Sequence, residues 1–104
     1  MVVDERCGVT ETEARETQSK IVKMFDDRYE TQHISTCGEY AHIFNISIYG
    51  KKSVHIEAQY SIQKDEWSYF RVWLRHKSVF YKEETTLNEI FNMMDQYIPV
   101  KERV

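Results

Sequence analysis

Histidine and cysteine are the side chains of this sequence with the chemistry for metal binding or nucleophilic catalysis. His33, Cys37 and His42 are zinc-competent ligands, but their spacings match no close CxxC or HxxxH pattern. A fourth ligand would have to come from elsewhere in the chain. Cys37, before Gly38, would be a reactive thiol only beside a base, and no residue pattern positions one. The sequence therefore predicts no metal site and no catalytic cysteine.

His55 and Glu57 lie two residues apart in an alternating segment, so they share one face of a predicted strand and could form an acid–base pair. A flat, exposed sheet face lacks the pocket that such catalysis generally needs, so we interpret both as ordinary polar residues on the exposed side of a strand. Phosphate loops, nucleophile elbows and dinucleotide fingerprints are absent, and the chain contains only three glycines. We expect no cofactor and a protein that is not an enzyme.

The length of 104 residues predicts one domain over 1–104, with an N-terminal arm at 1–9 and a C-terminal tail at 99–104. No apolar stretch approaches the ~20 residues that a membrane span requires, and the N-terminus lacks the pattern of a secretion signal. We therefore expect a cytoplasmic protein that does not contact a membrane. Cys7 and Cys37 are interpreted as free thiols, with a single bridge between them as the alternative.

Two capping boxes mark the starts of two helices. Thr10 with Glu13 begins a helix over about 10–30, whose apolar side includes Ile21, Val22 and Phe25. Thr86 with Glu89 begins the second, whose apolar stripe continues to Tyr97 and Ile98. The residue before a proline resists helical geometry, so Pro99 predicts an end near Tyr97.

Between the helices the apolar period becomes two, which predicts four strands, at 40–49, 53–62, 67–75 and 78–82. The stretch 31–39 is polar and is predicted to be a connection. A three-residue loop over 50–52 keeps the apolar sides of the first two strands together and pairs Ile46 with Ile56 and Phe44 with Ala58. In the last two strands the predicted core face carries Ser68, Phe70, Val72, Leu74, Val79 and Tyr81.

Each predicted helix has one apolar stripe and each strand has one apolar face. The simplest arrangement that buries all of this surface is a two-layer α+β fold, in the order α-β-β-β-β-α. In it, a four-stranded antiparallel meander carries both helices on one face. The sequence shows no internal repeat, linker or second domain.

The opposite face of this sheet holds the least ordinary set of side chains. The predicted face comprises Trp67, Tyr69, Arg71, Trp73 and Arg75 from one strand, with Phe80, Lys82 and Glu57 beside them. In the predicted register, Trp73 lies between Glu57 and Phe80. Aromatic residues and arginine are enriched in binding hot spots. The same residue types also stack on bases and neutralise phosphates.

We therefore predict a non-catalytic module that binds a partner protein through this face, of the kind found among small phage or mobile-element inhibitors and adaptors. A homodimer interface, single-stranded nucleic-acid binding and sheet stabilisation alone remain alternatives. Charge is divided along the chain, because residues 51–82 hold seven basic and three acidic side chains while both flanking parts are acidic. The first helix offers a second candidate surface, formed by Glu11, Glu13, Glu16, Asp26, Asp27 and Glu30.

Overall fold

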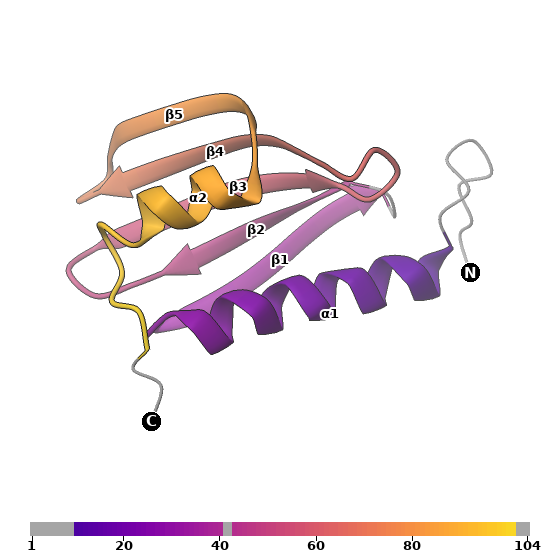
Figure 1. Cartoon of the computed structure of the whole chain (residues 1–104), viewed down its shortest axis with the longest axis horizontal. Helices are drawn as coiled ribbons and strands as arrows, with labels where there is room; N and C mark the ends of the chain where they lie inside the picture. The colour runs from indigo at the N-terminus through magenta and orange to yellow at the C-terminus, as the bar shows by residue number, and fades with distance from the viewer. Residues whose placement is uncertain (1–9, 41–42, 102–104) are drawn as a thin grey trace.

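The computed structural model describes residues 10–40 and 43–101, which form two helices and one antiparallel sheet (Figure 1). The α+β class predicted from the sequence is confirmed. The elements in chain order are α1 (Glu11–Arg28), β1 (His33–Tyr40), β2 (Ile43–Tyr49), β3 (Val54–Ser61), β4 (Glu66–Leu74), β5 (Lys77–Thr85) and α2 (Leu87–Met94).

The sheet has five strands in the order β1-β2-β3-β4-β5, so the prediction of four strands was wrong by one. The predicted connection over 31–39 is largely the edge strand β1, which pairs with β2 from His33 opposite Tyr49 to Cys37 opposite Asn45. Of the β1 side chains that the structure describes, at 33–38, Ile34 alone packs against the core, so the backbone pairing with β2 holds this part of the strand in place. Gly38 allows close approach, because a Cβ there would lie 2.9 Å from the carbonyl oxygen of Ile43.

Both helices pack on the same face of the sheet and share one core with it (Figure 1). The capping box at the start of α1 is confirmed in both directions, with Glu13 N–H donating to the Thr10 hydroxyl over 3.1 Å. At the other end of α1, the buried Tyr29 hydroxyl donates to Asp95 beyond α2, over 2.6 Å. This bond joins the ends of the two helices.

The β2–β3 pairing is displaced by two residues from the predicted register. Ile46 lies opposite Ala58, and Ile48 lies opposite Ile56. The connection covers residues 50–53 rather than 50–52. A displacement by two leaves every side chain on its predicted face, because the side-chain period of a strand is two. The apolar side of both strands is therefore buried as expected.

A bulge at the start of β4 overturns two of the predicted faces. The register changes between Gln59 opposite Tyr69 and Tyr60 opposite Trp67, which leaves Ser68 as the extra residue. Trp67 consequently turns into the core, where it is 7% exposed and packs against Phe25 and Tyr60. Trp67 does not belong to the open face, and Ser68 is exposed rather than buried.

A second bulge reverses the predicted faces of β5. The turn lies at Arg75 and His76 rather than at His76 and Lys77, and Val79 becomes the extra residue between Trp73 opposite Ser78 and Val72 opposite Phe80.

Phe80 therefore faces the helices and contacts Phe70, while Lys82 on the same side bonds to Glu89 of α2. Val79 and Tyr81, predicted in the core, are 48% and 45% exposed. The assignment of Phe80 and Lys82 to the open face was wrong.

Candidate functional site

The candidate site is the sheet face that carries neither helix, here called the open sheet face. Its main side chains come from four adjacent strands and are Tyr49, His55, Glu57, Tyr69, Arg71, Trp73 and Tyr81. Alternation places them there, because their neighbours in each strand point into the core. No other described segment packs over this face (Figure 1).

One end of the open sheet face is a row of rings that crosses four strands. His33 of β1 stacks on Tyr49 of β2, with 5.9 Å between ring centroids. Tyr49 in turn stacks on His55 of β3, at 4.4 Å and an interplanar angle of 12°. His55 lies directly opposite Trp73 of β4. Such cross-strand pairs fix the orientation of each ring, so the row is held in place before any partner arrives.

Arg71 connects this row to the β5 edge. Its guanidinium carbon lies 5.2 Å from the ring centroid of Trp73 and 4.6 Å from that of Tyr81, which are cation–π distances. It lies opposite Glu57 in the register, yet none of the described carboxylates forms an ion pair with it. Arg71 therefore holds its charge against aromatic rings rather than against an acid.

Glu57 is instead bonded to Tyr69. The Tyr69 hydroxyl donates to Glu57 Oε1 over 3.1 Å. Burial, together with the nearby Glu57 charge, raises the pKa of Tyr69 to about 12, so this hydroxyl stays protonated and keeps donating at neutral pH. The Tyr69 ring also lies 5.9 Å from that of Tyr81. This bond orients one carboxylate in the middle of the face.

Three polar atoms of this face are shielded from solvent without a hydrogen-bond partner in the described chain: His55 Nε2, Arg71 Nε and Trp73 Nε1. They are the only such side-chain atoms among the residues that the structure describes. An unpaired buried polar group costs about 1–3 kcal/mol, and native proteins contain few. Burial lowers the pKa of His55, opposed by the Glu57 charge, and so favours the neutral imidazole.

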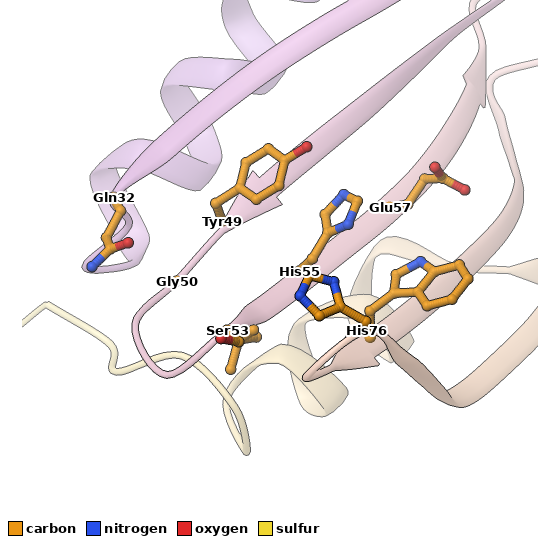
Figure 2. A pocket seen from close by; sticks show the side chains of 9 residues that line it. Gln32, Tyr49, Gly50, Ser53, His55, Glu57 and His76 are labelled. Atoms are coloured by element: carbon orange, nitrogen blue, oxygen red, sulfur yellow. The ribbon is translucent and has the colours of Figure 1, made fainter.

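A hollow of about 550 Å³ lies at the end of this face where the β2–β3 and β4–β5 turns meet (Figure 2). Tyr49, His55, Trp73 and His76 supply its rings, and the described lining is completed by Gln32, Gly50, Ser53, Val54 and Glu57. The volume is within the range of roughly 300–1,000 Å³ that is typical of ligand pockets.

Four basic residues, here called the basic hairpin end, lie in or next to the two turns that meet at this hollow, although none of them is among its described lining residues: Lys51, Lys52, Arg75 and Lys77. All four are exposed. The two turns that carry them are joined directly, because the backbone N–H of Arg75 donates to the carbonyl oxygen of Ser53 over 3.2 Å. The positive charge of residues 51–82, noted in the sequence, is thus concentrated partly at one end of the sheet.

The structure brings together part of the predicted site. Tyr69, Arg71, Trp73 and Glu57 lie on the open sheet face as predicted, although Arg71 and not Trp73 is opposite Glu57. Arg75 lies in the turn at the end of the face, with a φ of 49°. Trp67, Phe80 and Lys82 lie on the helix side.

Sequence reasoning did not select Tyr49 and Tyr81 as site residues. The alternation of β2 already placed Tyr49 on this face, so its signal was present. Tyr81 reaches the face only because of the Val79 bulge. The one visible signal was the run Val79-Phe80-Tyr81, in which three consecutive large side chains break the alternation.

The other candidate sites have fewer structural features that indicate binding. The acidic array on α1 is interrupted by its own ion pairs, Arg15 with Glu11 at 2.6 Å and Lys23 with Asp27 at 3.3 Å. Within residues 10–40 and 43–101, no three His, Cys, Asp or Glu side chains form a group that could hold a metal ion. His42 and Cys7, named in the zinc and disulfide hypotheses, lie outside the described residues.

Neither α1 nor α2, the helices of the described chain, is long and apolar enough to cross a membrane. No protein-family model matches this sequence, and comparisons with curated proteins and with solved structures also give no match.

Proposed function

We propose that this chain is a non-catalytic interaction module that binds a partner protein through its open sheet face. The observation that supports the proposal most is the coincidence of two features on one face. A connected set of Tyr, Trp, His and Arg side chains crosses the sheet. The same face holds all three unpaired buried polar atoms of the described side chains.

These residue types favour protein binding for a physical reason. Tyrosine, tryptophan and arginine offer large contact areas with polar tips, and they dominate the energetics of protein interfaces. Their rings are already ordered by mutual stacking, so little side-chain entropy remains to be lost on binding. An inhibitor or an adaptor would use such a face in the same way, by covering a surface of its partner.

The charge distribution favours a protein over a single-stranded nucleic acid. Alternation places the charged side chains Arg71, Glu57, Glu66 and Glu83 on the described strands of this face. A phosphate backbone running across the face would meet three carboxylates and one cation. Proteins that bind single strands generally line the whole path of the backbone with positive charge.

Site-specific photo-crosslinking tests the proposal even though the partner is unidentified. A photoreactive phenylalanine derivative replaces Tyr81, which is exposed on β5 and already aromatic. The control replaces Lys23, which is exposed on α1 in the other layer. Both variants are irradiated in the cells that make the protein, and the adducts are identified by mass spectrometry.

We expect a discrete adduct with another protein from position 81 and none from position 23. An adduct between two copies of the chain, supported by a dimeric mass in light scattering, would replace the proposal with a homodimer. An adduct with nucleic acid, or equal labelling from both positions, would overturn it.

A further inference from the structure

At one end of the open sheet face, the hollow lies next to the basic hairpin end. A flat surface could bind a partner without either feature, so their combination needs a separate explanation. Aromatic and imidazole rings from three strands and a turn line the hollow, and four exposed cations lie in or next to the two turns at this end of the sheet. The Arg75–Ser53 backbone bond fixes the two basic turns beside each other. The carboxylate among the lining residues, Glu57, is bonded to the Tyr69 hydroxyl.

We infer that this end of the sheet is the specificity site of the module and that it takes a short acidic segment of the partner protein, with one aromatic or large apolar side chain inserted in the hollow. The inference rests on the proposed function, which it deepens by naming the partner's chemistry. A side chain entering the hollow meets the stacked rings of Tyr49 and His55. Carboxylates on either side of it meet Lys51, Lys52, Arg75 and Lys77.

The placement of the cations supports a short peptide as the occupant. The four exposed cations in or next to the two turns lie at one end of the sheet, whereas the strands of the face carry Glu57, opposite Arg71, and Glu83 farther along β5. A local cluster of cations suits a few carboxylates, because ionic attraction between exposed groups decays over a Debye length of about 8 Å at physiological salt. A nucleic-acid strand continuing along the sheet would leave this cluster and meet the acids.

Selection of displayed random peptides on the 104-residue chain tests the inference. The selected peptides are then measured against three variants. K51E/K77E reverses one charge in each of the two hairpins whose turns meet at the hollow. K20E/K23E makes the same charge change on exposed positions of α1 and serves as the matched control. Trp73→Ala removes a ring of the open sheet face that also lines the hollow.

We expect the selected peptides to be rich in Asp and Glu around one aromatic or large apolar residue. Their dissociation constants should rise at least about tenfold in K51E/K77E and stay within about twofold in K20E/K23E. Binding should also weaken as salt is raised.

The two tryptophans supply an internal readout of location, because each gives one indole N–H signal in a proton–nitrogen NMR spectrum. The Trp73 signal should shift on peptide addition, while that of the core residue Trp67 should stay in place.

Peptides without acidic enrichment, or with affinity unchanged in K51E/K77E, would overturn the inference. If such peptides still lost affinity in Trp73→Ala, the proposed binding function would stand while the acidic specificity fell. Peptide affinity that is unchanged in both K51E/K77E and Trp73→Ala would count against the acidic specificity and against the proposed binding function. Tighter binding of an oligothymidylate than of the peptides, lost in K51E/K77E, would assign the site to nucleic acid and also overturn the inference.

Discussion

At the scale of single residues, the two tryptophans show how one strand serves both the core and the surface. Trp67 is 7% exposed and packs against Phe25 and Tyr60, with centroid distances of 6.1 and 4.8 Å. Trp73 lies half-buried on the open sheet face, next to Arg71. The bulge between them separates the structural role of Trp67 from the binding role that we propose for Trp73.

Substitution of each tryptophan by alanine should separate these roles. Trp67→Ala should lower the free energy of unfolding by about 3–5 kcal/mol, because it leaves a cavity in the core. Trp73→Ala should lower it by about 1 kcal/mol, the value of a cross-strand aromatic contact. Urea denaturation followed by circular dichroism measures both. Equal losses would show that Trp73 is as much a core residue as Trp67.

His55 makes stability depend on pH. Its pKa is lowered in the folded chain, mainly by burial, so the unfolded chain binds a proton more readily as the pH falls below about 6.5. The contribution of neutral His55 is therefore complete above that pH and is lost as the pH falls through the folded-state pKa. We expect the stability difference between wild type and His55→Gln to shrink from about pH 7.5 to about pH 5. A difference that grows on acidification would contradict the burial of this imidazole.

At the scale of elements, turns and bulges decide which side chains share a face. The capping boxes and the alternation of β2 and β3 are local signals, and they predicted both helices and two strand faces from the sequence. The bulges at Ser68 and Val79 depend on pairing with a neighbouring strand, and the one local sign of either was the run Val79-Phe80-Tyr81, which breaks the alternation. Strand β1 was missed for the same reason, since its polar sequence has no apolar alternation to read.

The β4–β5 turn offers a test at this scale. Arg75 and His76 adopt φ values of 49° and 67°, in the left-handed region that costs about 1–2 kcal/mol for a residue with a side chain. Asn followed by Gly is the preferred pair for a two-residue turn of this geometry. R75N/H76G should therefore stabilise the chain by about 1–2 kcal/mol, measured by urea denaturation.

The charge-reversal variant K51E/K77E changes neither Arg75 nor His76, the two residues of this turn. That variant should leave stability within about 0.5 kcal/mol of wild type. Destabilisation by R75N/H76G would show that the turn does not have this geometry.

At the scale of the whole molecule, one side of the sheet holds the core and the other is the face for which we propose binding. The helix side holds the core of the described residues. The open sheet face holds the ordered rings, the unpaired polar atoms and the hollow with its basic surroundings. From the sequence, the placement of Tyr69, Arg71 and Trp73 on one face could be predicted, because alternation is a local property. The hollow could not, because it depends on two turns that only the sheet register brings together.

Affinity for the crosslinked partner, measured by calorimetry on wild type and Trp73→Ala, tests the central claim most directly. If the open sheet face binds the partner, the dissociation constant should rise at least about thirtyfold, or about 2 kcal/mol, as expected for a hot-spot residue. Lys23→Ala, on the opposite layer, should leave it within about twofold. A Trp73→Ala variant that remains folded and binds as tightly as wild type would contradict the claim.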